Sequence, residues 1–246
     1  MRWALTALVV VAGTAWAWYR IRRRQDRQRT LMLLCEAAGL EFAPLDTFTG
    51  TAFLPFPMFG RTPSGTSNVV WDPRRDGDVR AFDFWYREES ENGGPGLKRS
   101  ITCAAVPLPF SSPRLRVTPR DLVHEIADAI ALPPITLELE EFNLRFRVEA
   151  EDARAASALL DQRVMEAFLR LPHGVIADVN DAVLLLWAPE LPAVGMLQLL
   201  QAANSIQRDL PRVMPSLFPP RPMRSPHEDR WLQGRWSSEP TGTDTT

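Results

Sequence analysis

The hydrophobic and polar positions of the chain separate sharply at its start. Residues 3–19, WALTALVVVAGTAWAWY, carry no charged side chain. As a helix, these about 17 residues would span roughly 25 Å, near the lower limit for crossing a bilayer. Trp3 stands at one edge, and the other edge carries Trp16, Trp18 and Tyr19, as in the aromatic belts of membrane helices. The pattern predicts a transmembrane anchor over residues 1–19.

A basic segment follows the apolar one. Residues 20–29 form an arginine-rich juxtamembrane collar with one acid, Asp26, and its arginines are Arg20, Arg22, Arg23, Arg24, Arg27 and Arg29. Basic residues next to a span favour the cytoplasmic side, so we expect the N-terminus outside and the collar inside. Because arginines are attracted to an anionic leaflet, the collar is also a predicted contact for anionic lipid.

Two other interpretations of this segment compete with the anchor. Ala15-Trp16-Ala17 matches the small-residue pattern at which signal peptides are cleaved. A signal peptide, however, carries its basic end before the apolar run, and here the basic end comes after it. A buried helix of a soluble domain is the third interpretation. The order of apolar and basic residues favours the anchor.

Beyond the collar, short apolar runs alternate with segments rich in proline and glycine. Period-two patterns predict strands at 67–71, 79–86, 99–108, 114–117, 135–139, 141–150, 174–178 and 182–187. The clearest is Glu141–Ala150, whose apolar face would hold Phe142, Leu144, Phe146 and Val148. Asp76-Gly77 predicts a tight turn, and Asn180-Asp181 predicts a hairpin between the last two strands.

Capping residues mark the expected helices. A helix over 30–40 should end at Gly39, and Thr118 followed by Pro119 should open another that runs to about Ile130. Asp152 and Asp161 are expected to cap two further helices. Residues 192–210, with an apolar stripe, form the last predicted helix.

Together these elements predict an α+β fold: an N-terminal transmembrane helix followed by one globular domain with mostly antiparallel strands and flanking helices. The domain should cover residues 30–215, and residues 216–246 should be a flexible tail rich in Pro, Ser and Thr. Proline-rich joints at 109–119 and 133–134 leave two lobes as an alternative.

The composition indicates an ordinary globular protein and argues against nucleic-acid binding, but it points to no catalytic activity. With 45% hydrophobic and 24% charged residues, the chain is ordinary for a globular protein. Its formal net charge is -2 in spite of the basic collar, so the remainder is acidic and does not suit nucleic acid. Lys98 is the single lysine. Cys35 and Cys103 lie in apolar runs and are expected to be buried thiols, which suits a reducing cytoplasm.

No motif with a known catalytic mechanism occurs, including those of nucleotide-binding loops, nucleophile elbows and zinc sites. The carboxylate pairs Glu140 with Glu141 and Asp178 with Asp181 are weak candidates for acid–base work. One face of the helix predicted after Thr118 would hold Asp121, His124, Glu125 and Asp128, an arrangement typical of a solvated face. We assign no catalytic, cofactor or metal residue, and the sequence leans against an enzyme.

A set of short motifs resembles an uncharacterised family of membrane-anchored bacterial proteins. It begins at Gly39-Leu40 and includes residues 56–60 (FPMFG), 82–86 (FDFWY), 107–109 (PLP), 141–143 (EFN) and 163–165 (RVM). The resemblance covers roughly Gly39 to Leu200. It implies the anchored architecture and no activity, ligand or catalytic residue.

The tail contains two tryptophans, Trp231 and Trp236, in an otherwise polar segment. Large aromatic side chains bind most strongly when buried, so we expect these two to contact a partner, the bilayer interface or the domain itself. The leading hypothesis is a single-pass, membrane-anchored, non-catalytic interaction or scaffold module on the cytoplasmic side of the cell membrane. Its partners would be the bilayer and an unknown protein. The alternatives are a lipid or small-ligand binding protein, and an enzyme whose site lacks known motifs.

Overall fold

The structure is a computed structural model that describes residues 2–45, 51, 54–75, 79–88, 96–122 and 132–220. It does not describe the side chains of residues 2–13, 15–17, 20 and 21. The predicted turn at Asp76-Gly77, most of the helix predicted after Thr118, and both tail tryptophans lie outside the described residues.

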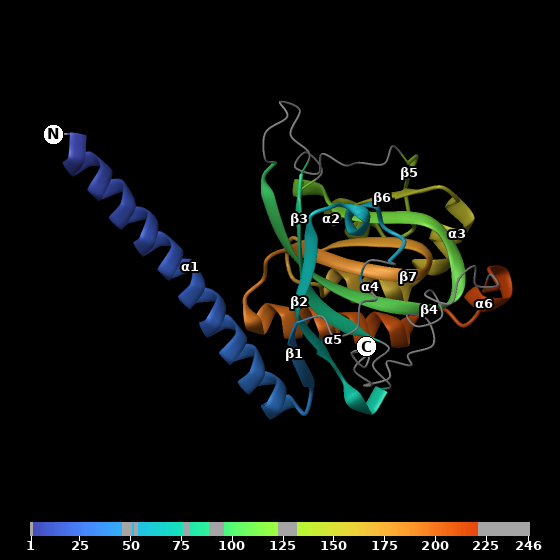
Figure 1. The fold of residues 1–246 in the computed structure, drawn as a ribbon. Helices are drawn as coiled ribbons and strands as arrows, with labels where there is room; N and C mark the ends of the chain where they lie inside the picture. Colours follow the sequence, from blue (N-terminus) through green and yellow to red (C-terminus); the bar gives the residue numbers. More distant parts are fainter. Residues whose placement is uncertain are drawn as a thin grey trace, which may run out of the picture.

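The chain begins with one long helix, α1 (Arg2–Ala38), of 37 residues. The helix predicted over 30–40 is its last part, and it ends where expected. Gly39 has a φ of +66°, the left-handed conformation that glycine adopts without a steric penalty. The N-terminal half of α1 projects from the rest of the protein, and its other end lies beside β1 (Figure 1). Among the described residues, no helix has both the length and the apolar character needed to span a membrane.

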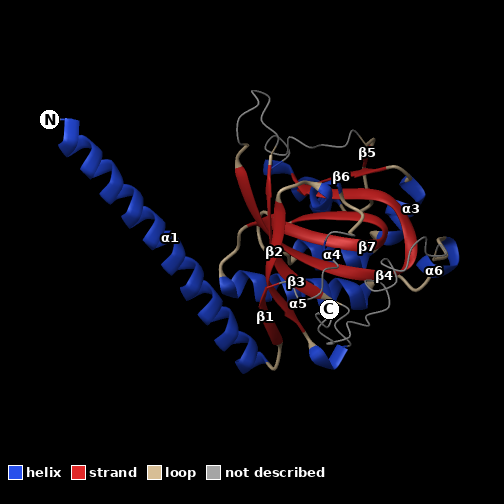
Figure 2. Ribbon diagram, viewed as in Figure 1, coloured by secondary structure: helices blue, strands red, loops and turns tan. Residues whose placement is uncertain are grey.

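Within the described residues, seven strands form a single sheet with antiparallel pairings throughout, in the order β1-β2-β3-β4-β6-β5, with β7 also paired to β4. This confirms the α+β class with antiparallel strands and flanking helices (Figure 2). The strands are β1 (Glu41–Leu45), β2 (Ser64–Trp71), β3 (Arg80–Arg87), β4 (Lys98–Pro119), β5 (Pro134–Ile135), β6 (Phe146–Ala150) and β7 (Ile176–Pro189).

The described helices after α1 are no longer than eight residues except for one. They are α2 (Glu140–Arg145), α3 (Ala153–Leu159), α4 (Gln162–Leu169), α5 (Ala193–Asp209) and α6 (Met214–Leu217), with 3-10 turns at Pro57–Gly60, Pro73–Arg75 and Arg120–Leu122. Two predicted caps are confirmed. The Asp152 side chain accepts hydrogen bonds from Arg154 N and Ala155 N, and Asp161 accepts one from Val164 N.

The prediction of separate strands at 99–108 and 114–117 was wrong, because β4 runs unbroken for 22 residues. It pairs with β3 through its first half and with β6 through its second. The prolines of residues 107–113 lie where the register with β7 shifts, and there a missing backbone N–H is tolerated. Thr118 and Pro119 are also paired, with Arg147 and Phe146, and a 3-10 turn at Arg120–Leu122 follows them directly.

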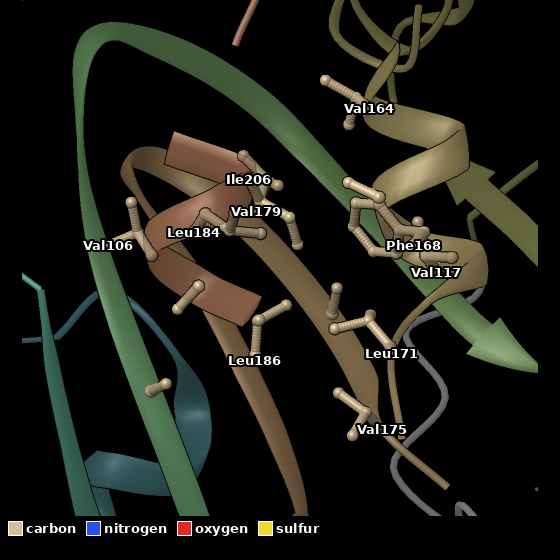
Figure 3. Packing of buried hydrophobic residues seen from close by; sticks show 14 of the residues in the cluster. Val106, Val117, Val164, Phe168, Leu171, Val175, Val179, Leu184, Leu186 and Ile206 are labelled. Carbon is tan, nitrogen blue, oxygen red and sulfur yellow. The ribbon is translucent and has the colours of Figure 1, made fainter. Parts of the chain in front are cut away.

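The predicted hairpin at Asn180-Asp181 was wrong as well. β7 is one strand of 14 residues that pairs with β4 on both sides of Asp181, and Asp181 has a φ of +52° where the register with β4 shifts. Before Asp181, Ala177 and Val179 face the larger core, and after it Leu184 and Leu186 do. The face of β7 that packs on the larger core therefore changes near Asp181, where β4 contributes the extra residues of the register shift and β7 curves back between Val179 and Leu184 (Figure 3).

The strand predicted over Glu141–Ala150 was wrong in its first half, which is the helix α2. Phe142 and Phe146 pack with ring centroids 5.0 Å apart, a contact that helical spacing also produces. Leu144, expected in the core, is 71% exposed. Arg145 donates to the backbone carbonyls of Leu169 and Leu171 at the end of α4, so it caps that helix.

Two apolar clusters occupy the two faces of the sheet. The larger lies under α5, and residues from β4, β7, α4 and α5 converge there, among them Val106, Leu184, Phe168 and Ile206 (Figure 3). The smaller contains Phe56, Phe59, Phe82 and Phe84. Cys35 belongs to the first cluster and Cys103 to the second, and both are buried free thiols, as expected.

Candidate functional site

The most elaborate polar site joins α1 to the sheet. Leu31 and Cys35 on the last turns of α1 are 0% and 1% exposed in the larger core, whereas Met32 and Leu33 beside them are exposed. This apolar face seats the C-terminal part of the helix on the domain. The polar site, which we call the helix clamp, lies immediately before these turns and comprises Arg27, Gln28, Asn68, Asp83, Thr102 and the backbone of Leu191.

Arg27 and Asp83 form the centre of the helix clamp. The two guanidinium Nη atoms of Arg27 face the two carboxylate oxygens of Asp83, with Nη2 3.0 Å from Oδ1. The Arg27 side chain also donates to the carbonyl of Leu191, from Nε at 3.0 Å and from Nη2 at 2.8 Å. Only 13% of the Arg27 side chain and 12% of that of Asp83 are exposed. The pair is therefore largely desolvated, which makes its loss costly.

Neighbouring groups complete the coordination of the carboxylate. Asn68 Nδ2 donates to Asp83 at 2.8 Å, and the Thr102 hydroxyl donates at 2.9 Å while accepting from Leu191 N at 3.0 Å. On the other side, Gln28 Nε2 donates to Asn68 Oδ1 at 3.1 Å. The bonds connect α1, β2, β3, β4 and the segment before α5, so the helix is held by four separate parts of the domain.

Asn68 reaches this position through an unusual backbone. Its φ is +55°, and the pairing of β2 with β3 shifts register between Ser67 and Val70. A left-handed residue that is not glycine costs free energy and persists where its surroundings compensate for it. Here the bulge turns the Asn68 amide toward both Gln28 and Asp83. The strained backbone of β2 at Asn68 thus allows the hydrogen bonds that hold α1.

Burial is the largest influence on the pKa values of Asp83 and Cys35, where α1 meets the sheet. Burial raises the pKa of Asp83 above its ordinary 3.8, and the charge of Arg27 with the hydrogen bonds from Arg27, Asn68 and Thr102 offsets only part of that effect. Burial, with the charge of Glu41, raises the pKa of the Cys35 thiol to about 11. The Cys35 thiol is therefore protonated and poorly reactive near neutral pH while α1 is docked.

The helix clamp divides the predicted arginine collar. Arg27 points into the domain, whereas Arg22, Arg23, Arg24 and Arg29 are exposed. Arg22 also lies over the ring of Trp18, with its guanidinium carbon 5.1 Å from the ring centroid. The side chain of Arg20 lies outside the described ones. Sequence reasoning placed Arg27 with the lipid-facing residues because nothing local distinguishes it from its neighbours. Its partner, Asp83, was visible only as a charge on an aromatic strand.

The other predicted polar groups that the structure describes do not converge. Asp178 is buried and accepts from Arg116 Nε at 2.5 Å and from Trp187 Nε1 at 2.7 Å, so it serves a structural contact of its own. Glu140 and Glu141 are exposed in the first turn of α2. His173 Nε2 lies 2.7 Å from Asp121 on the surface. Within the described ranges, no group of three or more His, Cys, Asp or Glu residues could hold a metal.

Among the described residues, three open grooves lie away from the helix clamp, and two of them bear on function. The larger, of about 770 Å³, runs between the segment 136–139 and the helices α3 and α4. Asn143 shapes its wall, because its amide bonds both Leu137 N, at 3.0 Å, and Leu137 O, at 2.6 Å. A second groove of about 510 Å³ is lined by residues 107–110 of β4 and by the end of α5 with the following segment up to Pro215.

The aromatic cluster, by contrast, is closely packed. Phe59 lies 4.7 Å from Phe84 and 6.1 Å from Phe82, ring centroid to ring centroid. The cavity beside Phe56 and Met58 has a volume of about 30 Å³, which accommodates a water molecule and not a lipid. The density of aromatic residues in this part of the sequence is thus accounted for by core packing.

Comparison with sequence-family models and with curated proteins gives no match. Among solved structures, the chain is similar to the crystal structure of the mycobacterial trehalose monomycolate transport factor A. The similarity has a TM-score of 0.48 and 15% sequence identity, and it covers 82% of this chain and 97% of that one. A similarity at this level carries no argument about function.

Proposed function

We propose that this protein is a membrane-tethered, non-catalytic interaction module in which α1 both reaches the bilayer and holds the domain in a fixed orientation. The observation that carries the proposal is the helix clamp. A tether that only needed to restrain a domain would leave the collar free, but Arg27 is bonded to Asp83 and Leu191. The C-terminal part of α1 is thus packed as part of the domain. The apolar N-terminal half belongs to the same helix and projects away from the domain (Figure 1).

The proposed location is the cytoplasmic face of the cell membrane, with the chain crossing once. Two sequence features support it: the charge-free residues 3–19 and the arginines that follow them. The exposed Arg22, Arg23 and Arg24 are available for anionic headgroups at the point where α1 leaves the domain. The apolar stretch is short, so insertion would depend on its aromatic ends and on the basic collar as well as on its length.

Membrane fractionation of cells expressing the full chain tests the tether. We expect the protein in the membrane fraction after an alkaline carbonate wash. A Val9→Asp, Val10→Asp variant should move to the soluble fraction, because each acid at the centre of a span costs roughly 2.5–3.5 kcal/mol. Gln25→Asp, in the exposed collar, is the matched control and should stay with the membrane. Release of the unmodified protein by carbonate would refute insertion.

Two further measurements address sidedness and partners. Two reporters are fused after Thr246, one that functions only in the cytoplasm and one that functions only outside it. We expect activity from the first alone, and activity from the second would overturn the orientation. Cross-linking in native membranes, followed by purification, should recover a reproducible protein partner. Recovery of none across independent preparations would count against an interaction module.

A second candidate function is small-ligand or lipid binding, favoured by the groove of about 770 Å³ beside α3 and α4. Its lining mixes Leu137, Leu160 and Met165 with Asp161 and Gln162, which suits an amphipathic ligand. Mass spectrometry of the protein purified without detergent exchange tests this idea. A bound small molecule that disappears in a Leu160→Trp variant would support it.

A further inference from the structure

The direction of α1 across the sheet is fixed by three contacts. Arg74, just after β2, contacts the carbonyls of Ala38 and Gly39 at the end of α1. Ten residues of helix earlier, Gln28 bonds Asn68 within β2, and Arg27 bonds Asp83 within β3. Moving toward the N-terminus of α1 therefore means moving along β2 toward Ser64. Since Ser64 pairs with Tyr86, this end of the sheet lies on the side to which the anchor projects.

We call the residues Arg61, Trp85, Tyr86, Leu97 and Lys98 at that end of the sheet the sheet-end patch, which wraps around the end because Trp85 with Lys98 and Tyr86 with Arg61 lie on opposite faces. The Lys98 ammonium lies 3.9 Å from the centroid of the Trp85 ring, and the Arg61 guanidinium lies 5.0 Å from that of Tyr86. Leu97 is 71% exposed next to Lys98. Trp85 is pressed onto Gly65, where a Cβ would come within 2.8 Å of its indole nitrogen, so the ring is firmly positioned.

The chemistry of the sheet-end patch suits an interface between water and lipid. Trp and Tyr combine an apolar ring with a polar group and concentrate at the headgroup layer. Lys and Arg keep their charge in water above apolar neighbours and are drawn to anionic lipid. Among the described residues here, Arg61, Arg87, Lys98 and Arg99 are basic, and Glu88 is paired with Arg99 at 2.8 Å. The described residues here therefore carry net positive charge beside an exposed leucine, and the formal balance is still +1 when Glu89 and Glu91 of the sequence are included.

We propose that the sheet-end patch rests on the headgroups of an anionic membrane, as a second contact beside α1. This inference depends on the proposed tether, because the helix clamp is what would bring this end of the sheet to the bilayer. With two contacts, both the distance of the domain from the membrane and its rotation about the axis of α1 would be fixed. The opposite end of the sheet, with β1 and the Ala38–Glu41 turn, would then face away from the membrane.

Lys98 makes the test specific, because it is the single lysine of the chain. The full chain is reconstituted into vesicles of phosphatidylcholine with a third phosphatidylglycerol, and a water-soluble amine reagent is applied. The acylation rate of Lys98 is read by mass spectrometry and compared with its rate in detergent micelles. Arg154→Lys supplies a control lysine at the exposed start of α3, and its rate is measured in the same molecules.

We expect acylation of Lys98 to slow about tenfold in the anionic vesicles, as for a contact made in about nine-tenths of molecules. The lysine introduced by Arg154→Lys should react equally fast in vesicles and micelles. Protection of Lys98 should weaken in vesicles of phosphatidylcholine alone and in a Leu97→Glu, Arg61→Glu variant, which removes the apolar and one basic contact.

Failure of the inference and failure of the tether give different results. If the protein floats with the vesicles but Lys98 reacts as fast as the control lysine, the tether stands and the sheet-end contact is refuted. If the protein does not float, the tether itself is refuted, and the inference with it. Equal protection of both lysines would mean that the vesicles hinder the reagent in general, and would also overturn a specific contact.

Discussion

Arg27 on α1 and Asp83 on β3, 56 residues apart in the sequence, share a paired guanidinium–carboxylate contact that is almost closed to solvent. Arg27 also reaches the carbonyl of Leu191, 164 residues further along. A residue expected at a lipid surface is thus the residue that fastens the helix to the domain.

Removing one partner of this pair should destabilise the domain strongly. Arg27→Ala leaves a buried carboxylate and an unpaired carbonyl, and we expect a loss of roughly 3–5 kcal/mol in the free energy of unfolding. Arg24→Ala, one turn away and exposed, should change it by less than about 0.5 kcal/mol. Urea unfolding of the full chain in mild detergent measures both. Equal stability of the two variants would show that the contact contributes little.

The acid pH dependence should carry the signature of Asp83. Because burial raises its pKa above 3.8, the folded protein holds a proton there at pH values at which the unfolded chain has released it. The contribution of Asp83 to the free energy of unfolding is full below pH 3.8 and is lost as pH rises through the raised pKa. The stability of the protein minus that of Asp83→Asn should therefore fall with rising pH in this range. Unfolding curves at successive pH values measure it, and a difference that grows with pH would contradict the direction of the shift.

Cys35 should report undocking of α1. Its pKa of about 11, against an ordinary 9.0, keeps the thiolate scarce while the helix is seated. Arg27→Ala should raise the alkylation rate of Cys35 by up to about a hundredfold, since two pKa units equal a hundredfold in thiolate. Cys103, buried in the sheet, is an internal control for global unfolding. An unchanged Cys35 rate would mean that the apolar face of α1 suffices for docking.

That the tail tryptophans contact the domain or a partner remains a prediction. The groove that ends at Pro215 is a specific place on the domain where they could bind. If Trp231 and Trp236 dock on their own domain, truncation after Pro220 should lower the melting temperature, because each buried indole removes about 150–250 Å² from water. A Trp231→Ala, Trp236→Ala variant should reproduce most of the loss. If melting is unchanged in both variants, and cross-linking to a partner disappears, the tryptophans face outward to that partner.

Local signals in the sequence predicted local structure well. Gly39 ends α1, and Asp152 and Asp161 cap the helices that follow them, because such choices depend on a few neighbouring backbone groups. The face of β3 with Phe82 and Phe84 was also recognisable, since alternation is a property of the strand itself.

The predictions from sequence were wrong where contacts between residues far apart in the chain determine the local structure. Asn180-Asp181 has the composition of a hairpin turn, but β4 pairs with β7 on both sides of it, so the two arms belong to one curved strand instead of pairing with each other. Phe142 and Phe146 fit both a strand face and a helix turn, and Asn143 and Arg145 settle the choice through Leu137 and α4. The helix clamp depends on a bulge at Asn68 and on Leu191, neither of which has a recognisable sequence signal.

The partners of β4 also dictate an order of events during synthesis. Thr102 is bonded to Leu191 N, 89 residues later, and β7 is the strand that covers β4 along both of its halves. When β3 and β4 leave the ribosome, β7 and Leu191 have not been made, so β4 lacks one neighbouring strand and the helix clamp lacks its contacts with Leu191. The apolar residues of β4 therefore stay partly uncovered until the last third of the chain emerges, which makes the nascent chain a natural client for chaperones.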